Sequence, residues 1–99
     1  MHKEVQFKNR DKFVELGIII SAIRKSKGMT QRELAERAFI SRSHLSNIEA
    51  PNIISSFALE TLFNIADALE ISAGDLLNIK LPSPQYINED SEFDNDKYY

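Results

Sequence analysis

Apolar residues recur at a helical period over much of this chain. From Asp11 onward they lie three or four positions apart, which predicts a helix with the inward residues Phe13, Leu16, Ile20 and Ile23. This helix should end before Gly28, because glycine tolerates the positive φ angle that often follows a helix. Residues 1–10 are polar and mixed in charge, so we expect them to form an N-terminal arm.

Two short helices joined by a tight turn at Phe39–Ile40 are predicted within Thr30–Glu49. The first opens with Thr30-x-x-Glu33, a capping box in which each side chain can bond to a free backbone N–H. Ser41 is the expected N-cap of the second helix, which Pro51 terminates. The inward positions of the pair are expected to be Leu34, Ala35, Ala38, Leu45 and Ile48.

Two further helices are predicted after a loop at residues 52–56. One runs from about Phe57 to Leu69, and a short fifth helix begins at Ser72-x-x-Asp75, which resembles another capping box. The apolar face of the fourth helix is expected to contain Leu59, Leu62, Phe63, Ile65, Ala66 and Leu69. No stretch alternates long enough to build a sheet, so we expect an all-α domain over residues 11–81.

Charge is distributed unevenly along the chain. Although the net charge is −3, residues 82–99 hold five acidic residues against Lys97 alone, a net charge of −4. By contrast, residues 24–42 hold six basic residues against Glu33 and Glu36, a net charge of +4. The local field matters more for nucleic-acid binding than the total charge does. We therefore expect a basic helical domain followed by an acidic, disordered tail.

Several classes of function find little support in the sequence. The chain has no cysteine, so a disulfide framework or a thiolate metal site is not possible. It has only two histidines, His2 and His44, and no phosphate-binding glycine loop or nucleophile motif. Its longest early apolar run, residues 17–20, is too short to cross a bilayer. We expect a cytoplasmic protein that is not an enzyme, has no cofactor or metal, and binds no small molecule.

The third helix has the chemistry of one that lies in the DNA major groove. Its outward positions would be Arg42, Ser43, Ser46 and Asn47, with His44 at the flank. Arginine can donate two hydrogen bonds to guanine, and asparagine can pair with adenine, whereas serine can meet either base. The same polar residues would also suit an ordinary solvent-facing helix. The helix pair and the basic residues around it favour DNA binding.

The second helix has a different expected role. Its N-terminal end can receive a DNA phosphate, with Gln31 at the first helical position as a donor. Arg32 and Lys27 would add positive charge there. Such contacts fix the position of a protein on DNA but carry no sequence information.

The ordered set of motifs resembles the Cro/cI-type, or Xre-like, helix-turn-helix family. The resemblance spans about residues 16–77 and rests on Leu16-Gly17, Arg24, Thr30-Gln31-x-x-Leu34-Ala35, Ser41-Arg42-Ser43, Leu45-Ser46-x-Ile48-Glu49 and Leu59-Glu60-Thr61-Leu62-x-x-Ile65-Ala66-x-Ala68-Leu69. It implies a compact five-helix domain, similar to that of lambda repressor, in a bacterial or phage-encoded regulator that binds operator DNA, usually as a dimer.

The resemblance also implies roles for individual residues. The base-reading positions would be Ser41, Arg42, Ser43 and Asn47, with Gln31, His44 and Ser46 at the DNA backbone. Ala35 occupies the small-residue position where two helices cross closely. Arg24 and Glu49 occupy positions that form a partly buried ion pair in many members, although Arg24 could instead be a phosphate contact or a surface charge.

Three departures from the family pattern affect these expectations. Phe39 stands where the family usually has glycine, so the turn either strains a positive φ angle by about 1–3 kcal/mol or takes another shape. Ala58 replaces a common capping serine, and Ser55 or Ser56 is expected to cap instead. The loop before the fourth helix is about two residues longer than usual, which changes a segment that often touches the DNA backbone.

One domain of this size buries too little surface for tight specific binding on its own. We therefore predict a homodimer on an inverted-repeat operator, acting as a transcriptional regulator and, by preference, a repressor. The expected dimer contact contains Leu76, Leu77, Ile79 and Leu81, which could equally pack back onto the domain. Ile53 and Ile54 could tuck inward or join that contact. The alternative function is a protein-interaction module, such as an antitoxin-like or anti-repressor-like protein, with the same fold.

Overall fold

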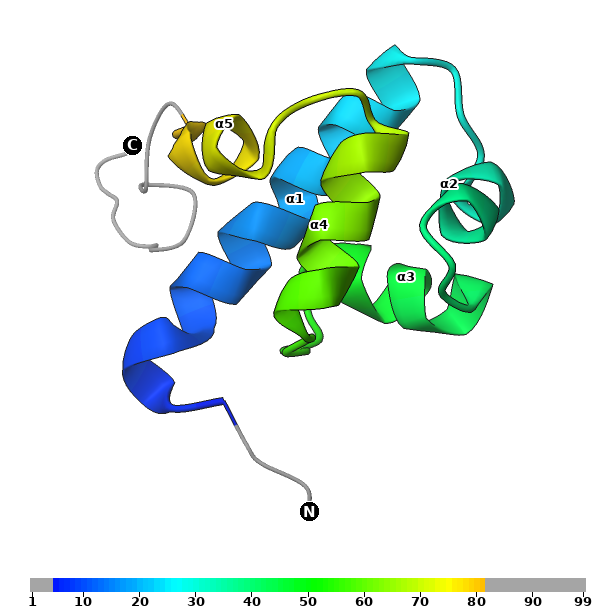
Figure 1. Cartoon of the computed structure of the whole chain (residues 1–99). Helices are drawn as coiled ribbons and strands as arrows, with labels where there is room; N and C mark the ends of the chain where they lie inside the picture. Colours follow the sequence, from blue (N-terminus) through cyan, green and yellow to red (C-terminus); the bar gives the residue numbers. More distant parts are fainter. Residues whose placement is uncertain (1–4, 82–99) are drawn as a thin grey trace, which may run out of the picture.

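The computed structural model describes residues 5–81 and shows a bundle of short helices around one core (Figure 1). The elements follow the chain in the order η1 (Phe7–Asn9), α1 (Arg10–Ser26), α2 (Gln31–Arg37), α3 (Arg42–Glu49), α4 (Leu59–Ala68) and α5 (Ala73–Asn78). Residues 5–81 contain no strand, and no helix in this range is long and apolar enough to span a membrane. The predicted all-α, five-helix class is therefore confirmed. The acidic tail at 82–99 lies outside the described residues.

The first long helix begins slightly earlier than the sequence indicated. A single 3-10 turn, η1, precedes α1, which starts at Arg10 rather than Asp11, so part of the expected arm is helical. Gly28 follows the helix with φ of 73°, as predicted, and its N–H donates to the Lys25 carbonyl oxygen at 3.0 Å.

Side chains cap the starts of α2 and α3 where the sequence predicted them. Thr30 Oγ1 accepts from the Glu33 N–H at 3.0 Å, and the Thr30 N–H donates to Glu33 Oε1 at 2.8 Å, which completes the capping box. The backbone hydrogen bond from Thr30 holds the pKa of the Glu33 carboxyl below its ordinary value. Ser41 Oγ accepts from the His44 N–H at 3.0 Å and so caps α3.

The turn between α2 and α3 keeps a positive φ angle although it contains a bulky residue. Phe39 has φ of 59°, and the next residue, Ile40, donates its N–H to the Ala35 carbonyl oxygen at 3.0 Å. This bond closes the end of α2 in the left-handed conformation that usually ends a helix. A glycine would adopt this conformation without strain, whereas the Cβ atom of Phe39 makes it strained. Of the two alternatives, the strained turn is the one present, and Phe39 is 84% exposed.

The start of α4 differs from the prediction in two ways. The helix begins at Leu59, two residues later than expected, and its N-cap, Ala58, has no side-chain acceptor. The expectation that Ser55 or Ser56 would cap this helix is therefore wrong. At the start of α5, Ser72 Oγ accepts from the Asp75 N–H at 3.0 Å, as predicted.

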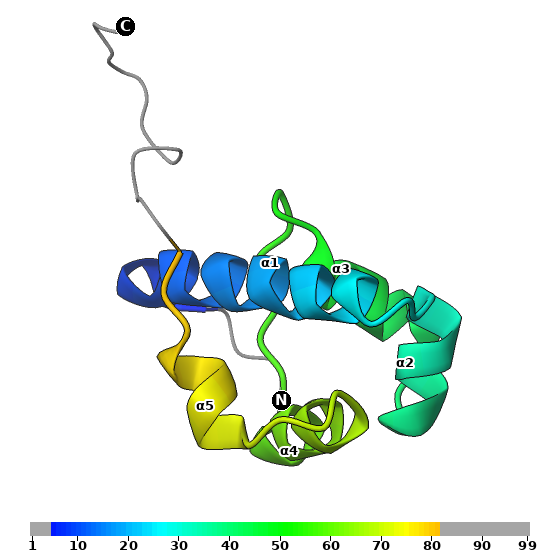
Figure 2. The same ribbon diagram turned by 90° about the horizontal axis from the view of Figure 1, so that it is seen from above.

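A continuous core fills the space between the helices. Its members come from all five α-helices and are Ile19, Ile20, Leu34, Ala35, Ala38, Leu45, Ile48, Leu62, Ile65, Ala66, Leu69 and Leu76. Figure 2 shows α3 running beside α1, with α2 at one end and α4 and α5 along the other side. Leu59 and Phe63 were expected to face inward, but they are 63% and 49% exposed.

Candidate nucleic-acid interface

The inner face of α3 is anchored, which leaves its outer face open to solvent. Leu45 and Ile48 are buried in the core, whereas Arg42, Ser43 and Asn47 are exposed. Because residues four apart share one face of a helix, Ser43 and Asn47 form a stripe with Arg42 at its leading end. The structure thus presents the three side chains with base-reading chemistry on a rigidly seated helix.

Three other α3 residues with predicted DNA contacts have more constrained positions. Ser41 is exposed, and its oxygen accepts the capping bond from the His44 N–H, which leaves its hydroxyl hydrogen and one lone pair available. The side chains of His44 and Ser46 are half-buried, on the flanks of the helix.

The positive side chains expected near a phosphate are free to reach one. Lys27 and Arg32 are exposed, and no ion pair engages either of them within residues 5–81. Lys27 ends α1 and Arg32 lies in the first turn of α2, so both stand beside the connection between these helices. This placement fits a role in fixing the protein on a DNA backbone.

A buried ion pair ties the first helix to the end of α3. Arg24 donates from Nε to Glu49 Oε2 at 2.8 Å and from Nη2 to Glu49 Oε1 at 2.9 Å, and both side chains are buried. Arg24 also donates from Nη1 to the Met29 carbonyl oxygen at 2.7 Å. Of the alternatives for Arg24, the structure contains the ion pair. Removal of one partner would leave a buried charge, at a cost of about 3–5 kcal/mol.

Gln31 joins this ion pair through its side-chain amide. Its Nε2 donates to Glu49 Oε1 at 3.0 Å, and the side chain is half-buried. Sequence reasoning assigned Gln31 to a phosphate and did not anticipate this contact, which links residues eighteen positions apart. A polar hollow of about 240 Å³ lies over the group, lined by Ser21, Arg24, Lys25, Gln31, Ser46, Glu49 and Ala50.

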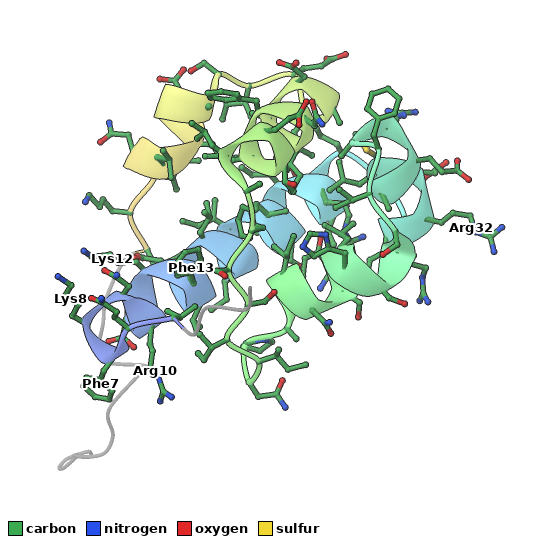
Figure 3. All side chains as sticks on the ribbon, turned by 60° about the horizontal axis from the view of Figure 1, so that its bottom comes forward. Phe7, Lys8, Arg10, Lys12, Phe13 and Arg32 are labelled. Atoms are coloured by element: carbon green, nitrogen blue, oxygen red, sulfur yellow. The ribbon has the colours of Figure 1, made fainter. Side chains whose placement is uncertain are left out.

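A second basic group lies at the start of α1. Figure 3 shows Lys8, Arg10 and Lys12 projecting from this end of the molecule, away from Arg32 on α2. The Arg10 guanidinium lies 5.6 Å from the centre of the Phe7 ring, a cation–π contact. These charges lie outside the basic segment from Arg24 to Arg42 that the sequence pattern indicated, and they come together because residues 7–12 are already helical.

The residues predicted to form a dimer contact fall into two groups. Leu76 is fully buried in the core, so its assignment to a dimer surface is wrong, and it packs back onto the domain instead. Ile79 and Leu81 are half-buried against the core, and the Leu81 N–H donates to Glu15 Oε2 at 3.2 Å. Leu77 is the most exposed of the four, at 56%.

The apolar loop residues Ile53 and Ile54 do not tuck fully inward. Their exposed fractions are 42% and 37%, which places both side chains at the surface. Of the two sequence-based alternatives, the structure favours their availability to a partner.

Comparison with known proteins gives one consistent result. Residues 20–76 match the helix-turn-helix family. The chain is 35% identical over 80 residues to the HTH-type transcriptional regulator SinR of Bacillus licheniformis, an alignment that covers 81% of this chain and 71% of SinR.

Two solved structures show how far the similarity extends in space. The restriction-modification controller protein C.AhdI from Aeromonas hydrophila superposes with a TM-score of 0.62 and 26% identity, over 67% of this chain and 97% of that one. The biofilm master regulator SinR in complex with DNA gives a TM-score of 0.58 and 35% identity, over 64% of this chain and 98% of that one.

Proposed function

The chain belongs to the Cro/cI-type, or Xre-like, helix-turn-helix family, and from its geometry we propose that it regulates transcription by reading the DNA major groove with α3. The observation that carries this proposal is the exposed stripe of Ser43 and Asn47 with Arg42 at its leading end. In this position the arginine can donate to guanine and the asparagine can pair with adenine. Ser41 adds a hydroxyl donor at the same end of the helix.

The contacts to the DNA backbone are assigned to the surrounding elements. Lys27 and Arg32 supply charge beside the start of α2, and Gln31 supplies a neutral donor there. To the half-buried His44 and Ser46, on the flanks of α3, we assign contacts with the DNA backbone at the edges of the groove. These side chains position the protein and leave base selection to α3.

The biological unit that we propose is a homodimer on an inverted repeat. A single domain makes too few contacts for tight specific binding, and two copies related by a two-fold axis double them. The exposed side chain of Leu77 and the half-buried Ile79 and Leu81 support a contact through α5 and the segment after it.

We propose a repressor that acts by binding and not by catalysis, in the cytoplasm of a bacterium or as a phage-encoded protein. The relatives support the regulatory role, since SinR is a transcriptional regulator and one SinR structure contains DNA. A dimer seated on an operator represses simply by occupying it, and needs no cofactor, metal or small-molecule ligand for that.

The rival function is a protein-interaction module, and the exposed apolar side chains Leu59 and Phe63 on α4 give it some support. Such a module would have no use for donors on the outer face of α3. Salt dependence separates the two functions, because the neutralisation of phosphates makes the affinity fall steeply as salt rises.

The experiment that tests the proposed function is selection of bound duplexes from a random DNA pool at low salt. We expect an enriched site with two-fold symmetry and half-sites separated by about one helical turn. Binding at low salt that weakens steeply with added salt supports direct DNA recognition. No retained duplex at low salt would favour the protein-interaction module.

A further inference from the structure

The Glu49 carboxylate accepts hydrogen bonds from two side chains, and only one of them is its ion-pair partner. Its Oε1 accepts from Arg24 Nη2 at 2.9 Å and from Gln31 Nε2 at 3.0 Å. The buried carboxylate therefore connects α1, α2 and α3 at a single oxygen.

The contact with Glu49 fixes which way round the Gln31 amide lies. A carboxylate can only accept hydrogen bonds, so the amide nitrogen and not the amide oxygen must face it. An amide nitrogen carries two hydrogens, and the bond to Glu49 uses one of them. The other remains available, on a side chain that cannot turn over without losing its bond.

The surroundings of the free N–H suit an anion. Gln31 and Glu49 both line the polar hollow of about 240 Å³, together with Ser21, Lys25 and Ser46. Arg24 compensates the negative charge of Glu49 through two hydrogen bonds, so the carboxylate repels a second anion less than a free one would. Lys25 adds an exposed positive charge at the rim.

We propose that Glu49 is a positioning residue for DNA binding, which holds the Gln31 amide so that its second N–H donates to a backbone phosphate seated at this hollow. The inference rests on the proposed DNA-binding function. On this proposal the Glu49 carboxylate contributes to the affinity for DNA as well as to the stability of the fold, and the two contributions are separate.

A double-mutant cycle tests the inference. The variants are Gln31→Ala, Glu49→Gln and both together, and the probe is a 20-base-pair duplex pool of random sequence at low salt, because a phosphate contact does not depend on sequence. Each single variant should lower the affinity about five- to tenfold, and the double variant should lower it no further than about tenfold. Ala22→Ser, on the exposed side of α1 and outside the hollow, is the control and should change nothing.

Comparison of thermal stability with DNA affinity separates a positioning role of Glu49 from a purely structural one. Glu49→Gln should lower the melting temperature with either residue at position 31, yet change the affinity only when Gln31 is present. Losses of affinity that multiply in the double variant would overturn the inference. If the wild-type chain does not bind the duplex pool at all, the proposed function fails together with it.

A measurement on the wild-type chain keeps the test informative if Glu49→Gln fails to fold. The two side-chain amide protons of Gln31 give separate NMR signals, assigned by their loss in Gln31→Ala. Titration with the duplex pool should move one of them strongly while the other keeps its hydrogen-bonded position. If neither proton responds at saturation, the amide does not touch the phosphate and the inference is wrong.

Discussion

Gly17 in the middle of α1 lies directly against the backbone carbonyl of Ile48 in α3. A Cβ atom at position 17 would overlap the Ile48 oxygen, so the two helix backbones approach as closely as they do only because this residue is glycine. We predict that Gly17→Ala lowers the free energy of unfolding by about 1–3 kcal/mol or more, measured by urea denaturation.

The matched control for this prediction is Gly74→Ala in α5. A Cβ atom there would meet nothing within 4 Å, and the residue is exposed within the helix. Alanine at position 74 should therefore raise stability by up to about 1 kcal/mol through its better helix propensity. If both substitutions had the same effect, the close approach of α1 and α3 would not be the cause.

The positive φ angle of Phe39 should be a removable source of strain. The residue is 84% exposed, so Phe39→Gly loses little buried surface. Relief of the left-handed conformation gains about 1–2 kcal/mol, and the greater freedom of glycine in the unfolded chain returns about half of it. We expect a net gain of about 0.5–1 kcal/mol in the free energy of unfolding. Phe39→Ala keeps the Cβ atom, so an equal gain from alanine would contradict the explanation.

The uncapped start of α4 offers a stabilising substitution. Ala58 has φ of −68° and ψ of 153°, close to the angles of the capping residues Ser41 and Ser72. In Ala58→Ser, the serine hydroxyl oxygen should accept a hydrogen bond from a free N–H group of the first turn. We expect a higher melting temperature and a gain of about 1 kcal/mol in the free energy of unfolding. Ala58→Val, which has no acceptor, should give no gain. A serine variant no more stable than the valine variant would show that this helix end is satisfied in another way.

The capping box at Thr30 and Glu33 should make stability depend on pH in the acid range. The hydrogen bond from the Thr30 N–H holds the pKa of Glu33 below its ordinary value, so the folded state favours the charged carboxylate. This contribution is complete above the unfolded pKa and is lost as the pH falls through the lower folded pKa.

Glu33→Gln provides the comparison, because glutamine can still cap but does not titrate. The stability of the wild type relative to this variant should be constant above about pH 5.5 and should fall as the pH is lowered below the unfolded pKa. Chemical denaturation over a series of pH values measures it. If the difference in stability between the wild type and the variant did not change down to pH 2.5, folding would not favour the charged form of the Glu33 carboxyl.

Local features of this chain could be predicted from the sequence, but features that depend on packing could not. The caps at Thr30, Ser41 and Ser72 are formed within three residues, so their side chains alone indicate them. The helical period, in contrast, does not say how wide the buried face of α4 is, which is why Leu59 and Phe63 were wrongly placed inside.

The same limit applies to the candidate site. The outward stripe on α3 follows from the buried positions Leu45 and Ile48, so its residues could be identified from the spacing. The bond between Gln31 and Glu49 depends on how α2 packs against the end of α3, and no local pattern encodes it. The burial of Leu76 beside the exposed Leu77 likewise depends on the angle at which α5 meets the domain.

The most direct test of the central claim is the base preference of Arg42→Ala, measured against every single-base variant of the site selected by the wild type. We predict that this substitution costs about 1–3 kcal/mol of binding free energy on the selected site and relaxes the preference at one base pair in each half-site. Lys27→Ala is the companion variant, and it should weaken all sequences alike and reduce the salt dependence. A preference left unchanged at every position by Arg42→Ala would contradict the reading of bases by α3.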